Sequence, residues 1–263
     1  MTIQKFSGMK YTQYFLTIIL ITYSNISCDD NLTDNTGFID PTEKYSLIWS
    51  DEFDGLTLDE SKWEYRFLGP RRKAINVKEA VSVDGKGNLT IRTFKDGDNY
   101  YTGMIGTENK FQSRFGYWEC RMKLQKQLGH WSAFWLQSPA IGRFIGNTRI
   151  SGTEIDIVEY MAMLDNIIEH ALHWDGYQES HKVVRSFTSI PGINDGYQTF
   201  GLEWTRNEYI FYVNGKETWR TNKAISHRPQ YIVLSLEVDY WAGNISEAIL
   251  PDSICIDYVR VYR

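Results

Sequence analysis

The sequence predicts an all-β protein whose strands form an antiparallel β-sandwich or jelly roll with a groove on its concave face. Short segments rich in β-branched and aromatic residues are separated by turn signals throughout residues 45–263. No segment keeps an apolar period of 3.6 residues for three turns, which argues against helices between the strands. Hydrophobic residues make up 42% of the 263 residues, enough for a large core, and aromatic residues reach 15%. Aromatic rings in excess of packing needs are typical of sites that bind flat or sugar-like ligands.

The first 27 residues have the pattern of an export signal. Lys5 and Lys10 precede an apolar run at 15–21 that is too short to span a bilayer. The segment ends at Cys28 in a pattern that resembles a bacterial lipoprotein cleavage site. We therefore expect a lipoprotein signal peptide at 1–27, lipidation of Cys28 and anchoring at the outer membrane or cell surface. The alternative is ordinary signal cleavage that leaves Cys28 unmodified.

Residues 28–44 are polar, acidic and rich in turn-forming residues, which predicts a flexible tether between the anchor and the domain at 45–263. The net charge of -5 and the lack of a long basic run exclude a nucleic-acid partner. Three cysteines without paired spacing give neither a disulfide scaffold nor a zinc site, so we expect Cys120 and Cys255 to be separate buried thiols. We expect a monomer whose membrane contact is the lipid anchor alone.

Four segments show the strand pattern most clearly, at 87–93, 116–124, 209–213 and 231–236. The third is followed by Asn214-Gly215 and a further strand-like segment at 216–219. Asn-Gly supplies the positive φ angles of a two-residue turn, so this pair of segments is predicted to be a β-hairpin. Many short strands without intervening helices favour a sandwich or a jelly roll.

The stretch at 152–161 contains the candidate catalytic residues. It is a strand by its content of Ile and Val, and alternation places Glu154 and Asp156 on one face. Strict alternation would bury Glu159 in the core, where an unpaired carboxylate costs several kcal/mol. A β-bulge near 157–158 would return Glu159 to the face of the other two acids.

Three acids in line on one strand repel one another and do not stabilise a fold. They suit the cleavage of a glycosidic bond, in which one carboxylate attacks the anomeric carbon and a protonated carboxyl gives its proton to the leaving oxygen. The alternative is a solvated acidic edge, which is disfavoured by the Ile- and Val-rich strand and the aromatic, exported chain.

Several ordered stretches resemble glycoside hydrolase family 16 in its laminarinase-like form, which carries a bulged E-x-D-x-x-E signature. These stretches lie at 47–55, 115–121, 129–136, 154–159 and 256–262. The resemblance covers nearly the whole domain. It implies a concanavalin-like jelly roll with a substrate cleft, and endo-acting, retaining hydrolysis of a β-linked polysaccharide.

The resemblance also implies roles for individual residues. By position, Glu154 matches the nucleophile, Glu159 the acid/base and Asp156 the residue that tunes the pair. Substrate-binding positions are expected at Trp131, Trp135, His173, Trp174, Glu237, Trp241 and Asn76. Several of these have a plainer interpretation: Trp131 and Trp135 could be a core pair, and His173 a structural histidine.

Two features depart from the laminarinase pattern. Glu237 stands where an uncharged residue is usual, and the basic run at 69–73 could contact an anionic or sulfated sugar, although we favour a solvated loop. Glu52, Gly87 and Asp257 match a structural calcium site of some members, and oxygen ligands suit calcium. No cofactor is expected to be required for catalysis.

We therefore predict an endo-acting retaining β-glycanase, with β-1,3- or mixed-linkage glucan as the first substrate. A β-galactan such as agar, porphyran, carrageenan or a keratan-like chain is the alternative within the class. A non-catalytic, glycan-binding lipoprotein is the alternative outside it.

Overall fold

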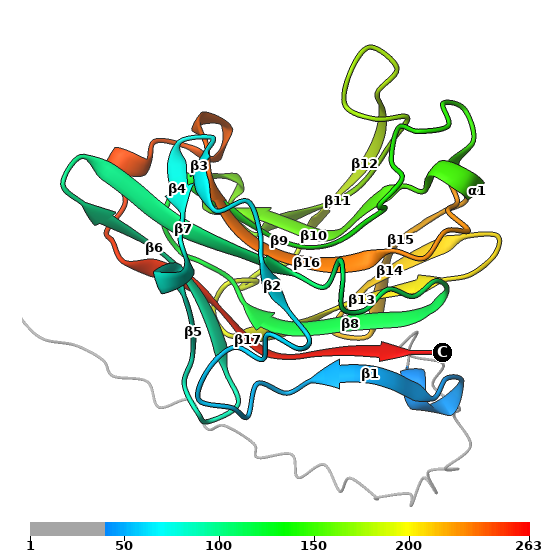
Figure 1. The fold of residues 1–263 in the computed structure, drawn as a ribbon, viewed down its shortest axis with the longest axis horizontal. Helices are drawn as coiled ribbons and strands as arrows, with labels where there is room; N and C mark the ends of the chain where they lie inside the picture. The colour runs from blue at the N-terminus through cyan, green and yellow to red at the C-terminus, as the bar shows by residue number, and fades with distance from the viewer. Residues whose placement is uncertain (1–39) are drawn as a thin grey trace, which may run out of the picture. The chain divides into compact units, whose positions relative to one another are not determined.

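The computed structural model describes residues 40–263, which form two packed β-sheets joined by short turns (Figure 1). The predicted signal peptide, Cys28 and most of the predicted tether lie outside the described residues. The strands are β1 (Leu47–Asp51), β2 (Glu64–Tyr65), β3 (Gly69–Arg71), β4 (Ala74–Asn76), β5 (Val81–Val83), β6 (Leu89–Asp96), β7 (Asn99–Gly106), β8 (Gly116–Lys123), β9 (His130–Gln137), β10 (Glu154–Met161), β11 (Ile167–Trp174), β12 (Lys182–Ser189), β13 (Tyr197–Trp204), β14 (Tyr209–Val213), β15 (Lys216–Thr221), β16 (Tyr231–Val238) and β17 (Asp252–Tyr262).

Helical segments are short. They are α1 (Thr148–Ser151) and five 3-10 turns, namely η1 (Pro41–Glu43), η2 (Lys78–Ala80), η3 (Ala162–Leu164), η4 (Tyr240–Ala242) and η5 (Ile245–Glu247). Within residues 40–263, no helix is both long and apolar enough to cross a membrane. The end of the predicted tether is folded onto the domain, because η1 is followed by Lys44, which forms an ion pair with Glu203.

The upper sheet in Figure 1 is concave and runs β7–β16–β9–β10–β11–β12, with every neighbour antiparallel. The lower sheet runs β6–β17–β8–β13–β14–β15, and β1 also pairs with β17. Antiparallel strands bury one face and leave the other free, so the concave face of the upper sheet is open to a ligand. The predicted all-β jelly-roll fold is confirmed.

The core lies between the two sheets and follows the period of two along each strand. On β9, Phe134 and Leu136 are fully buried in this core, while Trp131 and Trp135 point to the opposite, concave face. Each large apolar side chain buried in this way contributes about 1.5–3 kcal/mol to folding. The alternation thus makes β9 both a core strand and the floor of the cleft.

Two further predictions about local structure are confirmed. Strands β14 and β15 form a hairpin, and Asn214 and Gly215 have φ angles of 50° and 75°, as the two-residue turn requires. Cys120 and Cys255 are separate free thiols, as predicted. The predicted burial holds for Cys120 but not for Cys255, which is half-buried.

Candidate active site

Strand β10 carries a bulge that brings its three acids to one face. Asp156 pairs with Ala171 of β11, but the next pair joins Glu159 to Glu169, so Ile157 and Val158 of β10 stand opposite His170 alone. The pairing with β9 shifts over the same residues. The bulge predicted at 157–158 is therefore confirmed, and it places the three acids in the cleft while Ile155, Ile157 and Val158 are fully buried beneath them.

The cleft is a hollow of about 770 Å³ that crosses the concave sheet. Its lining extends from Phe67 and Arg71, beside β3, to Arg185 and Phe187 on β12. β12 is an edge strand that pairs with β11 alone among the described strands. The groove crosses β16, β9, β10, β11 and β12, so it has room for several sugar units of a chain.

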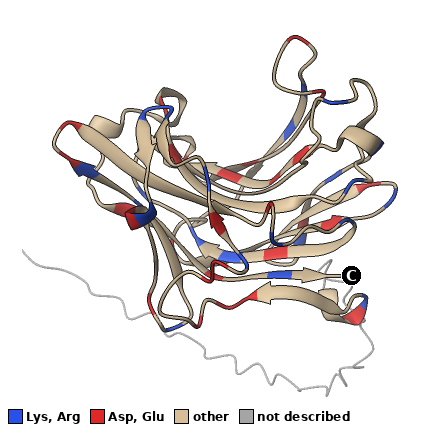
Figure 2. Ribbon diagram, in the orientation of Figure 1, with Lys and Arg blue, Asp and Glu red and all other residues tan. Residues whose placement is uncertain are grey.

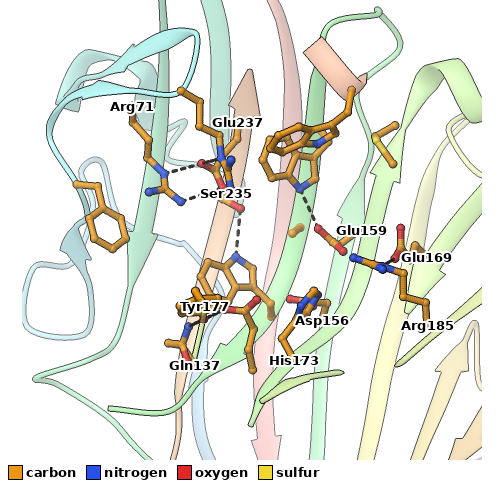
Figure 3. A pocket seen from close by; sticks show the side chains of 18 of the residues that line it. Arg71, Gln137, Asp156, Glu159, Glu169, His173, Tyr177, Arg185, Ser235 and Glu237 are labelled. Carbon is orange, nitrogen blue, oxygen red and sulfur yellow. Dashed lines mark hydrogen bonds and ion pairs between the residues drawn. The ribbon is translucent and has the colours of Figure 1, made fainter. Parts of the chain in front are cut away.

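Two neutral donors hold the carboxylate of Glu154. Gln137 on β9 donates from Nε2 to Glu154 Oε2 at 2.7 Å, and the hydroxyl of Tyr177 donates to the same oxygen (Figure 3). Burial raises the pKa of Glu154 to about 7, against the lowering effect of these two hydrogen bonds. The two donors therefore keep part of the Glu154 population ionised at neutral pH.

Glu159 is held in a different state. Trp131 donates its indole N–H to Glu159 Oε1 at 2.9 Å. Burial, together with the nearby charges of Glu169 and Glu154, raises the pKa of Glu159 to about 8. At neutral pH most of the Glu159 side chains are therefore protonated, which is the state that a general acid needs.

Asp156 lies between the two glutamates and is 4% exposed. Burial raises the pKa of Asp156 well above its ordinary value, and the negative charges of Glu159 and Glu154 raise it further. His173 Nε2 lies 3.4 Å from Asp156 Oδ2, and His173 Nδ1 lies 2.9 Å from His181 Nε2. Burial lowers the pKa of His173 to about 4, so this imidazole is neutral at pH 7.

A cationic wall stands at one side of the cleft and consists of Arg71, Arg72, Glu237 and Trp241. Arg71 Nε and Arg72 Nε lie 2.5 and 3.1 Å from the same oxygen of Glu237. The guanidinium of Arg72 also lies over Trp131 and Trp241, at 4.9 and 4.6 Å from their ring centroids. Our preference for a solvated loop at 69–73 was wrong, because Arg71 and Arg72 line the cleft.

Five of the seven predicted substrate-binding positions line the cleft: Trp131, Trp135, His173, Glu237 and Trp241. Trp174 does not, because it follows His173 on β11 and so points to the opposite face, where it packs against the core. Asn76 does not line the cleft either, so its predicted role in substrate binding is wrong. It is 2% exposed, and its side-chain amide donates to the backbone oxygen of Arg66.

Several cleft residues were missed by the sequence analysis, namely Gln137, Glu169, Tyr177, His181 and Arg185. Gln137 could have been found, because it lies two residues after Trp135 on the same strand and therefore on the same face. Tyr177 and His181 lie in the β11–β12 connection, whose path has no signal in the sequence.

The three positions predicted to bind calcium do not show a converging set of carboxylates. Glu52 pairs with Arg260 at 2.8 Å, and Asp257 forms an ion pair with Arg121. Both acids have cationic partners, which a calcium ion would have to displace. A structural calcium at these three positions stays a prediction.

Comparison with known proteins agrees with this geometry. Residues 46–263 match the family model described as β-porphyranase A–D, GH16 domain. The chain belongs to glycoside hydrolase family 16. The family membership that the resemblance implied is thereby confirmed.

Two relatives and one solved structure illustrate the family. A keratan-sulfate endo-1,4-β-galactosidase of Sphingobacterium multivorum is 28% identical over 84% of this chain and 56% of its own length. A glucan endo-1,3-β-glucosidase A1 of Niallia circulans is 27% identical over 83% of this chain and 38% of its own. The laminarinase catalytic domain of Thermotoga maritima superposes with a TM-score of 0.70 at 26% identity, covering 83% of this chain and 98% of that domain. This family-16 chain therefore spans about half or less of the two curated relatives.

Proposed function

We propose that the protein is an endo-acting, retaining β-glycanase that hydrolyses internal β-glycosidic bonds of a polysaccharide. The observation that carries this proposal is the contrast between two carboxyls on one bulged strand. Two donors favour the ionised form of Glu154, whereas burial and neighbouring carboxylates favour the protonated form of Glu159. Retaining glycosidases need this pair of states at one scissile bond.

In the first step, Glu154 attacks the anomeric carbon while Glu159 gives its proton to the departing glycosidic oxygen. In the second step, Glu159 takes a proton from water, which attacks the anomeric carbon and releases Glu154. Asp156 lies between the two and keeps them electrostatically coupled. A non-catalytic binding protein has no use for three repelling acids, which disfavours that alternative.

The substrate proposed first is a β-1,3- or mixed-linkage glucan. Its support lies in the relatives, among which are a glucan endo-1,3-β-glucosidase and endo-1,3-1,4-β-glycanases. Trp131, Trp135 and Trp241 give the cleft aromatic surfaces of the kind on which neutral sugar rings stack.

A sulfated or otherwise anionic β-galactan is the second candidate, and the cationic wall favours it. The guanidinium groups of Arg71 and Arg72 line the cleft, and planar guanidinium groups match the paired oxygens of a sulfate or carboxylate. The matching family model is named for porphyranases, and one relative is named for keratan sulfate.

Product release from a polysaccharide panel tests both candidates. The panel contains laminarin, mixed-linkage glucan, agarose, porphyran, carrageenans and keratan sulfate, and it is run with wild type, Glu154→Gln and Glu208→Gln. Glu208 is the matched control because it does not line the cleft. We expect one polysaccharide to shorten rapidly, with the first products retaining the β-anomer, and no products from Glu154→Gln.

Binding without release by the wild type would overturn the hydrolase proposal. Because the proposed chemistry uses only carboxyl groups, we expect activity to survive exhaustive chelation with EDTA.

We also propose that the protein is exported, lipid-anchored through Cys28 and monomeric. The support for the anchor is the signal pattern that ends at Cys28. Incorporation of labelled palmitate into the full chain, and its loss in Cys28→Ser, would support the anchor, whereas equal labelling of both would refute it. Light scattering of the purified domain measures the oligomeric state.

A further inference from the structure

We propose that Tyr177 is a positioning residue for the nucleophile: its hydroxyl selects which oxygen of Glu154 attacks and keeps that carboxylate ionised. This inference rests on the proposed function, in which Glu154 forms the covalent intermediate. Tyr177 lies in the β11–β12 connection, 23 residues after Glu154 along the chain, and this hydrogen bond brings it into direct contact with β10.

The hydrogen bonds to Glu154 are all on one side of its carboxylate. Gln137 Nε2 and Tyr177 Oη both donate to Oε2, and Gln137 Nε2 also lies 2.6 Å from Tyr177 Oη. Within residues 40–263, no hydrogen bond reaches Oε1 of Glu154. The two donors therefore hold Oε2 in place and leave Oε1 as the oxygen that is free to attack.

The loop that carries Tyr177 is fixed to its neighbour. Asp175 accepts hydrogen bonds from the backbone N–H of Gly146 and from Lys182 Nζ, both at 2.8 Å. Gly142 and Gly176 touch so closely that a Cβ on Gly142 would lie 2.8 Å from the Cα of Gly176. These contacts tie the β9–β10 connection to the β11–β12 connection, so the position of the Tyr177 hydroxyl is set by both loops.

The chemistry of the two steps suits this arrangement. When Oε1 bonds to the anomeric carbon, the bond to the departing oxygen breaks and that oxygen takes the proton of Glu159. Oε2 then becomes the carbonyl oxygen of the glycosyl ester and still accepts from Gln137 and Tyr177. Partial burial and the negative charge of the adjacent Glu154 raise the pKa of Tyr177, so its hydroxyl keeps its proton and remains a donor in both steps.

Other charged groups around Glu154 do not replace these donors. The titratable groups that face it are Asp156 and Glu159 on β10, His173 on β11, Glu237 and Tyr231 on β16, and Arg71 on β3. Only Arg71 among them carries a positive charge that favours the carboxylate, and it is already paired with Glu237. Loss of the Tyr177 hydroxyl should therefore raise the pKa of Glu154.

The test compares Tyr177→Phe with Tyr197→Phe in protein labelled with ¹³C at the glutamate carboxyls. Tyr197 is the control because its hydroxyl also donates one hydrogen bond, to Asn88 Oδ1 at 2.6 Å, outside the cleft. Glu154 is assigned by the resonance that disappears in Glu154→Gln. Because Tyr177→Phe removes a hydrogen bond to a charged carboxylate, we expect it to raise the pKa of Glu154 by about one unit. We expect no change in the pKa of Glu154 in Tyr197→Phe.

Kinetics supply the second readout. We expect the acid limb of kcat/KM in Tyr177→Phe to move up by the same unit, and kcat to fall about tenfold with little change in KM. An unchanged Glu154 titration, or a loss confined to KM, would overturn the proposal. The titration needs no turnover, so it remains informative if the wild type cleaves no polysaccharide and the proposed function fails. The Tyr177 side chain is 51% exposed, so removal of its oxygen leaves the core intact.

Discussion

The charge of Glu159 should weaken the fold above neutral pH, and Glu159→Gln should relieve this cost. Burial raises the pKa of Glu159 from 4.5 to about 8 in the folded protein. A carboxyl with a raised pKa binds its proton more tightly when folded, so its stabilising effect is complete below about pH 4.5 and is lost as pH rises through 8. Glutamine has no proton to lose and escapes this cost.

The size of the effect follows from the two pKa values. A rise from 4.5 to about 8 corresponds to about 5 kcal/mol at ~1.4 kcal/mol per pH unit. Glu159 is half-buried and faces the water of the cleft, and solvent screening reduces this figure to about 2 kcal/mol. For a domain of this size that is a gain of about 6 °C in Tm for Glu159→Gln at pH 9.

Urea and thermal unfolding of wild type and Glu159→Gln at pH 4 and pH 9 measure the difference. Glu203→Gln is the control with the opposite sign. The hydrogen bonds of Lys44 and Tyr45 lower the pKa of Glu203 against the effect of its burial. The stabilising effect of Glu203 is therefore present above its unfolded pKa and lost as pH falls, so Glu203→Gln should lose stability at pH 9 and lose less at pH 4.

The reasoning is refuted if Glu159→Gln gains equally at both pH values, or if it loses stability at pH 9. An equal gain would mean that packing, not charge, sets the difference. A loss at pH 9 would mean that the carboxylate of Glu159 is well paired in the fold, which would also remove the physical basis for its role as the acid.

Three further predictions concern activity and packing. The dependence of kcat/KM on pH should be bell-shaped, falling below about 7 as the nucleophile is protonated and above about 8 as the acid ionises, and a flat profile across pH 6–9 would contradict it. Arg72→Ala should raise KM about tenfold on an anionic galactan and much less on a neutral glucan, whereas Lys73→Ala, which removes a cation over an exposed tyrosine ring, should leave both unchanged. Gly116→Ala should lower the free energy of unfolding in urea by about 3 kcal/mol, because φ is 91° and the new Cβ would collide with the carbonyl oxygen of Tyr262. Gly97→Ala, whose Cβ would have nothing within 4 Å, should lower it by about 1 kcal/mol. Equal losses in the two variants would contradict the steric argument.

The parts of the site that follow from local rules were predictable from the sequence. A strand alternates its side chains, and a glutamate in the core is costly, so these two rules alone place the bulge before Glu159 at 157–158. The same rule of alternation should have excluded Trp174, because it follows the cleft residue His173 directly. A place on the strand beside β10 is not enough to put Trp174 in the cleft, because its side chain packs against the core instead.

The parts that depend on distant segments were not predictable. Arg71 and Arg72 form a short basic run, and such runs are usually solvated. Their partner Glu237 is 166 and 165 residues away along the chain, so the buried carboxylate that draws them into the cleft has no local signal. The predicted sugar contact of Asn76 is wrong for the same reason. Asn76 is buried because β4 pairs with both β3 and β7, and this pairing has no local signal in the sequence.

The different roles of Glu154 and Glu159 show how local sequence rules and contacts between distant segments combine. The sequence supplies two chemically identical side chains five residues apart, and only their match to the family signature indicates which is the nucleophile. The tertiary structure makes them different: Glu154 receives two donors, whereas Glu159 receives one and lies near the charge of Glu169 (Figure 3). Acidic positions, red in Figure 2, lie on strands of the concave sheet. The environment alone would assign Glu154 as the carboxylate and Glu159 as the acid. Position and environment are separate arguments, and they reach the same assignment.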